Sequence, residues 1–398
     1  MTRKTRDRLL TRLQRSGRHP EDWDGSLNVP LHRASTIAFE SIGDYEKRPP
    51  RGSGRASYGV SGTRTHFAFQ EAISELEGAA DSITLSSGLA AVTMALQVFV
   101  EAGDHILVTD SIYFPGRRFC DRVLKRYGVE TTYYDPLIGA GIEDLVRPNT
   151  KLIYMESPGS ATFEVQDVPA LVEVAKRHGI RTAFDNTWAT PVYFRPIEFG
   201  VDVSIQAGTK YIGGHADIML GYLSLAPEVA TQVVHETLYH GHCCGVEEAY
   251  LGLRGLRSLA PRLAQHGASA LKVARWLEAR PEVARVLYPP LESDPGHALW
   301  QRDFEGGTGL LGAVLAEPYG KDAVAAMIDG YELFEIGASW GGFASLAVTA
   351  YPEKYRLPGG WEAPGPLIRY HIGLEDPDDL IADLEAGFQR LTQASGAT

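Results

Sequence analysis

The chain has 398 residues, of which 44% are apolar and 22% are charged, so it is long enough for more than one packed domain and is typical of a globular protein. Its 38 Lys and Arg residues against 50 Asp and Glu residues give a net charge of −12, which argues against nucleic acid as a partner. The three cysteines, Cys120, Cys243 and Cys244, cannot form a disulfide framework and lack the spacing of a structural zinc site. We therefore expect no metal site and a reducing, cytoplasmic compartment.

Residues 1–60 come before the first regular alternation of apolar residues. The stretch 1–17 is basic and has no apolar core of signal-peptide length, and we expect it to form a helix. The residues that follow, to about 60, are rich in Arg, Pro, Gly and Ser, which predicts an extended arm. No run of about 18 apolar residues occurs anywhere, so we expect no membrane-spanning segment and no membrane partner.

Between residues 61 and 256, short apolar runs alternate with helical patterns. Helices are predicted over 66–78, 89–103 and 168–179. Strands are predicted over 82–85, 105–110, 131–135, 151–156, 181–186, 201–206 and 218–225. Such alternation indicates right-handed βαβ units around a mostly parallel sheet, so the predicted fold class is α/β.

Beyond residue 256 the pattern changes to longer helical segments. Helices are predicted over 263–283 and 378–391, with a strand over 309–316 between them. We expect a large domain over 61–256 and a smaller α/β domain over 257–398, with a boundary near residues 255–260.

The stretch 200–219 carries the first candidate for covalent chemistry. Lys210 follows Thr209 on the turn beyond a predicted strand, at the edge of an α/β sheet where ligands bind. A lysine at a strand end is usually solvated, but the glycines around this one let backbone approach a ligand closely. An amine in a dry pocket has a lowered pKa and attacks carbonyls, so Lys210 is a Schiff-base candidate.

Asp185 follows a predicted apolar strand 25 residues before Lys210. A carboxylate at a buried strand end needs a partner, because isolated buried charge is costly. It is either a helix N-cap or ion-pair residue, or the group that keeps a cofactor's pyridine nitrogen protonated.

Ser87, Gly88 and Leu89 form a turn from a strand into a helix. Their free N–H groups and the helix dipole would favour a phosphate. The alternative is an ordinary capped helix after a tight turn.

Two further residues lie beside predicted strands. Tyr113 is on a loop after a strand, where it would either pack in the core or stack on a flat cofactor ring. Arg369 lies in an alternating strand, where it would either pair with Glu375 or Asp376 on the surface or bind a substrate carboxylate through two hydrogen bonds.

The order and spacing of several short motifs resemble the Cys/Met-metabolism family of enzymes that depend on pyridoxal 5′-phosphate (PLP). The motifs are SSGLAA, SIYFPG, ESPGS (156–160), DNTWA, SIQAGTKYIGGHAD, RGLRSL (254–259), SWGGFASL (339–346) and LIRYHIGLED. The resemblance extends from about residue 25 to residue 392. It implies the fold type I PLP-dependent transferase-like fold, a homotetramer built from close dimers, and active sites shared across the dimer interface through the N-terminal arm.

The resemblance also implies a role for each candidate residue. Lys210 would carry PLP, Asp185 would contact the pyridine nitrogen and Tyr113 would stack on the ring. Ser87, Gly88, Leu89 and Thr209 would surround the phosphate. Arg369 would bind the substrate α-carboxylate, with Ser339 and Trp340 nearby. Tyr58 would reach into the neighbouring subunit's site.

The reaction that the resemblance implies is α,β-elimination by a carbon–sulfur lyase. The substrate would be an amino-acid thioether, cystathionine or a related cysteine S-conjugate, and the products a thiol (homocysteine from cystathionine), pyruvate and ammonia. A γ-lyase or γ-replacing transferase of the same family is the alternative, and a non-catalytic relative is a third possibility.

Two positions depart from the family pattern. Val60 stands where most of the family has an arginine that binds phosphate from across the interface, and Ala207 stands where a phosphate-binding serine is usual. Arg64, four residues after Val60, is our candidate for the missing cation.

Overall fold

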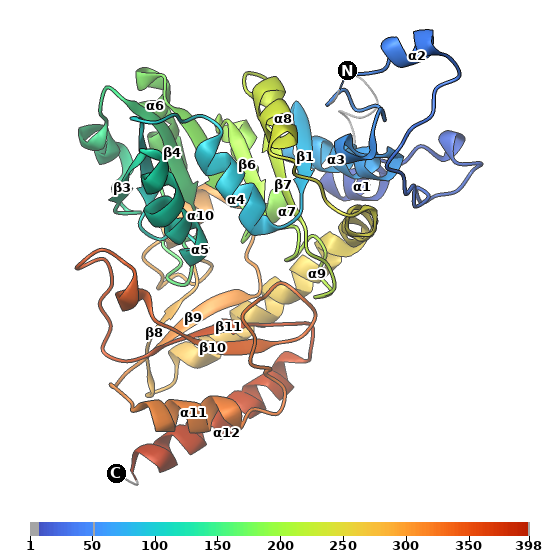
Figure 1. Cartoon of the computed structure of the whole chain (residues 1–398). Coiled ribbons are helices and arrows are strands. Elements are labelled where there is room, and N and C mark those ends of the chain that lie inside the picture. Colours follow the sequence, from blue (N-terminus) through green and yellow to red (C-terminus); the bar gives the residue numbers. More distant parts are fainter. Residues whose placement is uncertain (1–7, 51, 397–398) are drawn as a thin grey trace.

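The computed structural model describes residues 8–50 and 52–396, so part of the helix expected at 1–17 lies outside the described residues. The chain is built on two β-sheets, one of seven strands between residues 81 and 225 and one of four strands between residues 283 and 371. Figure 1 shows the larger sheet above the smaller one, with the N-terminal arm extending to one side. No helix in the described ranges is long and apolar enough to cross a membrane.

The large sheet has the strand order β1-β7-β6-β5-β4-β2-β3. Its strands are β1 Asp81–Leu85, β2 His105–Thr109, β3 Glu130–Tyr134, β4 Thr150–Glu156, β5 Arg181–Asp185, β6 Val203–Gln206 and β7 Gly221–Leu225. Strands β2 to β6 are mutually parallel, and β7 is antiparallel to both β6 and β1. The carboxyl ends of every strand except β7 therefore meet at one edge of the sheet.

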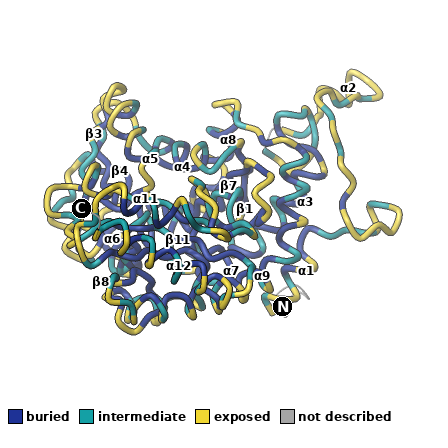
Figure 2. Tube along the Cα trace, turned by 90° about the horizontal axis from the view of Figure 1, so that it is seen from below, coloured by how far each residue is buried: buried dark blue, intermediate teal, exposed yellow. Residues whose placement is uncertain are grey.

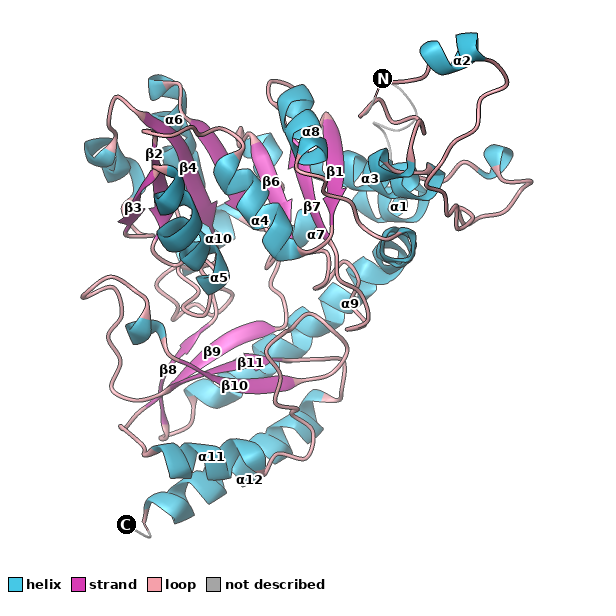
Figure 3. Ribbon diagram, in the orientation of Figure 1, coloured by secondary structure: helices cyan, strands magenta, loops and turns pink. Residues whose placement is uncertain are grey.

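Helices cover both faces of this sheet, as Figure 3 shows. They are α3 Arg64–Glu77, α4 Gly88–Gln97, α5 Phe114–Phe119, α6 Val168–His178, α7 Thr190–Tyr193 and α8 Ala230–Tyr239. Successive residues of a strand point to opposite faces. In β2, Ile106 and Val108 pack in a core with α4 and α8, whereas Leu107 packs in a core with α6. Figure 2 shows that buried residues follow the strands between these layers.

The small sheet is antiparallel, in the order β10-β11-β9-β8. Its elements are β8 Val283–Leu287, β9 Leu310–Leu315, β10 Leu346–Ala350, β11 Leu367–His371, α10 His297–Asp303, α11 Lys321–Asp329 and α12 Pro377–Ser395. α11 and α12 lie together beneath this sheet in Figure 1. The core that contains α6 continues into the small sheet, so the two parts of the chain share buried surface.

A single long helix, α9 (Val246–Glu278), runs between the two sheets. Pro261 lies inside it and has no N–H, so the carbonyl of Arg257 one turn earlier has no partner in the helix. The side-chain amide of Gln14 donates to that carbonyl at 2.7 Å. Gln14 belongs to α1 (Leu9–Arg15), which therefore attaches to α9 at its proline.

The predicted strands of the large sheet and its helices at 66–78 and 168–179 are confirmed to within a few residues, as are the strand at 309–316 and the helix at 378–391. The predicted mostly parallel α/β architecture is confirmed as well. Two helix predictions were wrong in extent. The helix expected over 89–103 ends at Gln97, and Asp104 bonds the Glu101 N–H at 2.8 Å in the turn that follows.

The helix expected over 263–283 begins at Val246 and ends at Glu278, and residue 283 begins β8. The expected boundary near residues 255–260 therefore falls inside α9. Gly255 lies inside this helix although glycine lowers helix stability. It allows close packing, because a Cβ on it would lie 2.0 Å from the carbonyl oxygen of Ile212.

Candidate active site

A cavity of about 390 Å³ lies at the edge of the large sheet where the strands end. Residues from both parts of the chain line it: Ser87, Gly88, Leu89, Val92, Tyr113, Glu156, Pro158, Gly159, Ser160, Ala161, Phe163, Asp185, Thr187, Trp188, Ala207, Thr209, Lys210, Met219, Leu310, Ala338, Trp340 and Arg369. The structure thus brings together the side chains that the sequence singled out after β1, β2, β5 and β6 with two that it singled out near the small sheet, Trp340 and Arg369.

Lys210 extends into the cavity from the turn after β6. Its Nζ donates a hydrogen bond to Ser339 Oγ at 2.6 Å and lies 5.3 Å from the centre of the Trp340 ring. Burial, reinforced by the Arg369 charge and opposed by Asp185, lowers the pKa of the Lys210 amine to about 8. A substantial fraction of this amine is therefore neutral, and able to attack a carbonyl, near physiological pH.

Asp185 ends β5 and is buried in the cavity wall. Its Oδ1 accepts hydrogen bonds from Thr187 N at 3.0 Å and from Thr187 Oγ1 at 2.5 Å. Burial raises the pKa of Asp185, while the Thr187 hydrogen bonds and the Lys210 charge act in the opposite direction. The sequence analysis missed Thr187, which also accepts a hydrogen bond from Ala207 N at 2.9 Å and so ties the ends of β5 and β6 together.

The turn from β1 into α4 forms one end of the cavity. Ser87 caps α4, because its Oγ accepts a hydrogen bond from Ala90 N at 3.1 Å. The amides of Gly88 and Leu89 precede the first intrahelical hydrogen bond, so α4 offers them to an anion. A Cβ on Gly88 would lie 2.4 Å from the Cβ of Ala207, so glycine is required for this close approach. The turn is therefore a capped helix whose first residues, Gly88 and Leu89, line the cavity.

Thr209 and Tyr113 also reach the cavity. The Thr209 hydroxyl accepts a hydrogen bond from Leu220 N at 2.9 Å, which fixes the turn before Lys210. Tyr113 is 44% exposed, so it is not a core residue. Burial of part of its ring raises the pKa of the phenol, and the nearby carboxyls of Glu156 and Asp185 raise it further.

Arg369 projects from the middle of β11 into the cavity. One Nη donates to the carbonyl oxygens of Gly337 and Ser339, each at 3.1 Å, while its buried Nε has no hydrogen-bond partner. Glu375 instead accepts hydrogen bonds from Ser345, so the surface ion pair considered for Arg369 is not formed with it. An arginine anchored by carbonyls, with a buried donor unused, is suited to bind a carboxylate.

Ser339 and Trp340 are held against Lys210 by the turn that follows them. Gly341 has φ 84°, and a Cβ on it would lie 2.9–3.0 Å from the backbone of Lys210 and Tyr211. His371, whose pKa burial lowers to about 3, contacts this turn through Nε2, at 3.2 Å from Gly341 N. Neutral His371 therefore helps to fix the loop that carries Ser339, the residue that accepts a hydrogen bond from Lys210.

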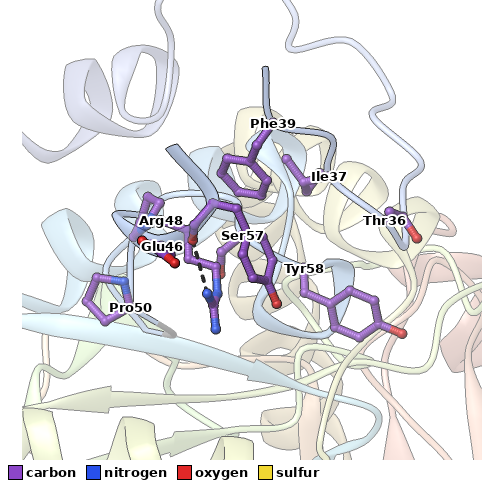
Figure 4. A pocket seen from close by; sticks show the side chains of 10 residues that line it. Thr36, Ile37, Phe39, Glu46, Arg48, Pro50, Ser57 and Tyr58 are labelled. Atoms are coloured by element: carbon purple, nitrogen blue, oxygen red, sulfur yellow. Dashed lines mark hydrogen bonds between the residues drawn. The ribbon is translucent and has the colours of Figure 1, made fainter. Parts of the chain in front are cut away.

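Tyr58 and Arg64 are not brought to the cavity within one chain. Tyr58 lies on the arm beside a second hollow of about 600 Å³, which it lines together with Arg48 (Figure 4). Arg64 is exposed at the start of α3, where its guanidinium lies 5.4 Å from the centre of the Trp23 ring.

Comparisons with known proteins show the family to which the chain is related. The sequence profile described as Cys/Met metabolism PLP-dependent enzyme matches residues 11–389. A Rhizobium johnstonii protein described as a candidate cystathionine beta-lyase is 50% identical over 394 residues, which are 97% of this chain and 98% of that protein. Cystathionine beta-lyase MetC of Escherichia coli is 44% identical over 392 residues, which are 96% of this chain and 99% of that protein. The crystal structure of metB from Corynebacterium glutamicum matches with a TM-score of 0.90 at 29% identity and covers 98% of this chain and 100% of its own.

Proposed function

Because the chain belongs to the Cys/Met metabolism family of PLP-dependent enzymes, we propose that it cleaves the Cβ–S bond of cystathionine or a related cysteine S-conjugate by α,β-elimination. The products would be a thiol, pyruvate and ammonia, and the thiol from cystathionine would be homocysteine. The observation that carries this proposal is the meeting of Lys210, Asp185 and Arg369 in one cavity.

The residues of the cavity fit PLP. The amides of Gly88 and Leu89, with the hydroxyl of Thr209, form a set of donors suited to a phosphate. Lys210 supplies an amine of lowered pKa for the aldehyde, and Asp185 supplies a buried carboxyl for the pyridine nitrogen. We propose these five residues, Ser87, and Tyr113, which would stack on the ring, as the cofactor-binding set within one chain.

PLP, when bound, supplies an electron sink for the carbanion that forms when the Cα proton is lost. We propose Lys210 as the base that removes this proton, because its amine is desolvated and free to titrate near neutral pH. The two Thr187 hydrogen bonds act against the rise in the Asp185 pKa that burial causes, and we propose that the ionised Asp185 favours a protonated ring nitrogen. Lys210 or Tyr113 then assists departure of the thiol.

We propose Arg369 as the residue that binds the substrate α-carboxylate. Its Nε and second Nη are the donors that the Gly337 and Ser339 carbonyls leave available. Ser339 and Trp340 would contact the substrate from the same loop, beside the Lys210 amine.

We further propose that the working enzyme is a homotetramer of close dimers in which the arm, residues 1–60, reaches a second copy of the chain. Large apolar side chains of the arm are exposed, among them Ile42 at 75% and Tyr58 at 47%, as expected for a segment that another copy covers. Tyr58 would then enter the neighbouring site. We propose Arg64 as the cation that binds the phosphate from the neighbouring copy, since Val60 carries no charge and the Arg64 guanidinium is exposed.

The organisation of the chain and its compartment remain proposals of the same kind. We propose a PLP-binding domain over 61–256 and a C-terminal domain over 257–398, with α9 crossing the boundary. The free thiols of Cys120, Cys243 and Cys244 are consistent with a reducing, cytoplasmic compartment.

The purified enzyme supplied with cystathionine tests the reaction. The proposal expects visible cofactor absorbance and release of pyruvate with homocysteine. Release of 2-oxobutyrate with cysteine would show γ-elimination and replace the proposal with the γ-lyase alternative. Absence of both products with every cysteine S-conjugate tried, in a protein that binds PLP, would favour a non-catalytic relative. Lys210→Ala is the control, because it removes both the cofactor amine and the base.

A further inference from the structure

Glu156 is a carboxyl in the cavity that the proposed reaction does not use. It is the last residue of β4, and its Cα is paired in register with that of Asp185, the last residue of β5. Side chains paired in register on neighbouring parallel strands point to the same face of the sheet. Both carboxyls accordingly line the same cavity.

The two carboxyls differ in the donors that reach them. Asp185 accepts from both the amide and the hydroxyl of Thr187, and the Lys210 amine contributes a favourable charge. For Glu156 the recorded donor, among the residues that the structure describes, is Tyr113 N, at 2.6 Å from Oε2. Glu156 is half-buried and Asp185 is buried, and when two neighbouring carboxyls are shielded from water the one with fewer donors holds the proton more tightly. The geometry places that proton on Glu156.

The electrostatics agree with the geometry. Burial raises the pKa of Glu156 well above its usual range, and the charges of Asp185 and, less strongly, of Glu164 raise it further, while the single Tyr113 hydrogen bond opposes these effects. The short amide contact favours an ionised Glu156, but one amide does not offset both desolvation and a neighbouring negative charge.

We propose that Glu156 is a neutral carboxylic acid at physiological pH and acts as a positioning residue for Tyr113. Its carbonyl oxygen accepts the Tyr113 N–H and so fixes the start of the loop that carries the ring over the cavity. Because Glu156 is uncharged, the negative charge of Asp185 stands alone beside the ring nitrogen of the cofactor. This inference rests on the proposed roles of Asp185 and Tyr113.

Infrared difference spectroscopy of the holoenzyme tests the protonation directly. The wild type is expected to show the carbonyl stretch of a protonated carboxyl at pH 8.5, and Glu156→Gln is expected to lack it. Glu77→Gln is the matched control, because burial raises the pKa of Glu77 to about 7 and its carboxyl is largely ionised at that pH. The proposal is overturned if the wild type shows no protonated-carboxyl band, or if the band persists in Glu156→Gln. This outcome does not depend on the substrate of the enzyme.

Substitutions at Glu156 test the positioning role. Glu156→Gln keeps a neutral side chain of the same length with an oxygen acceptor, whereas Glu156→Asp withdraws the acceptor by one methylene and Glu156→Ala removes it. We expect Ala and Asp to lose more than tenfold in kcat and to change the visible circular dichroism of the bound cofactor, and Gln to recover most of both. A Gln variant as impaired as the Ala variant would show that the charge of Glu156 is required and would overturn the proposal.

Discussion

At the scale of single residues, the chemistry of the cavity depends on how far burial lowers the pKa of the Lys210 amine. Its pKa is lowered from 10.5 to about 8, so the neutral form gains about tenfold for each pH unit up to pH 8 and then levels off. We expect the rate at which apo-enzyme captures PLP to follow the same curve, because the neutral amine is the nucleophile. Stopped-flow absorbance between pH 6 and 10 measures this rate. A rate that kept rising past pH 9 would place the pKa of Lys210 near its ordinary value.

The Arg369 guanidinium allows a second test at this scale. Arg369→Lys keeps the positive charge but loses the planar fork that the Gly337 and Ser339 carbonyls orient. Loss of a buried charge-assisted pair costs on the order of 2–5 kcal/mol, so kcat/KM should fall by at least about thirtyfold. The Kd of PLP should change much less. A large loss of PLP affinity with unchanged substrate kinetics would assign Arg369 to the cofactor instead.

The residues that the sequence could predict are those whose chemistry is unusual where they lie. Lys210 and Asp185 lie beside strand ends, where an unpaired charge would be costly, and the structure places both in the cavity. Thr187 and Glu156 were missed as site residues for different reasons. Thr187 acts through contacts with Asp185 and Ala207 that only the folded turn creates. Glu156 lay within a quoted motif, but its significance comes from the register of β4 against β5.

At the scale of elements, the turn after Trp340 sets the position of the loop that faces Lys210. Gly341→Ala would force a side chain into a left-handed conformation and bring its Cβ to 2.9–3.0 Å from backbone atoms that cannot move aside cheaply. We expect a loss of PLP retention and a free energy of unfolding lowered by more than about 2 kcal/mol. Thermal unfolding and cofactor absorbance measure the two effects.

Gly359 provides the matched control for this substitution. Its φ is 79°, close to that of Gly341, but a Cβ on it would meet nothing within 4 Å. Gly359→Ala therefore carries only the conformational cost, about 1–2 kcal/mol. Equal losses in the two variants would mean that the close approach of Gly341 to Lys210 has no energetic consequence.

Short apolar runs predicted most of the strands because the strands of the large sheet, apart from the edge strand β3, are largely buried on both faces. This pattern could not predict the direction in which strands pair, and it missed part of the small sheet. Nothing in the residues of β7 distinguishes an antiparallel strand from its parallel neighbours, since all five of its residues are buried. β8 exposes two of its five residues and was not predicted as a strand, and its first residue, Val283, was placed at the end of the helix expected over 263–283.

At the scale of the whole molecule, buried ion pairs connect the part of the chain that forms the large sheet to the part that forms the small sheet. Arg356, from the loop between β10 and β11, donates to Asp110 at 2.6 Å and to Glu164 at 2.8 Å. The Arg356 and Asp110 side chains are 3% and 2% exposed. Asp110 also pairs with Arg117, so one buried carboxylate joins two arginines from different regions.

Arg356→Met should therefore destabilise the enzyme by about 3–5 kcal/mol, because Glu164 loses its cation and Asp110 loses one of two. Urea unfolding followed by tryptophan fluorescence measures the change. Arg147→Met is the control, since Arg147 and its partner Glu130 are 47% and 68% exposed and an exposed pair contributes at most about 1 kcal/mol. A change no larger than that of the control would mean that solvent screens the Arg356 network.

The proline in α9 has a mechanical consequence. Relative rotation of the two sheets would have to flex the helix that runs between them, and a helix flexes most readily where a hydrogen bond is missing. In α9 that place is the turn before Pro261, and Gln14 braces it from outside by taking the free carbonyl of Arg257. The hydrogen bond from Gln14 thus ties a helix near the N-terminus to the turn of α9 that lacks an internal hydrogen bond, so we expect a substitution at Gln14 to loosen that turn without touching any residue that lines the cavity.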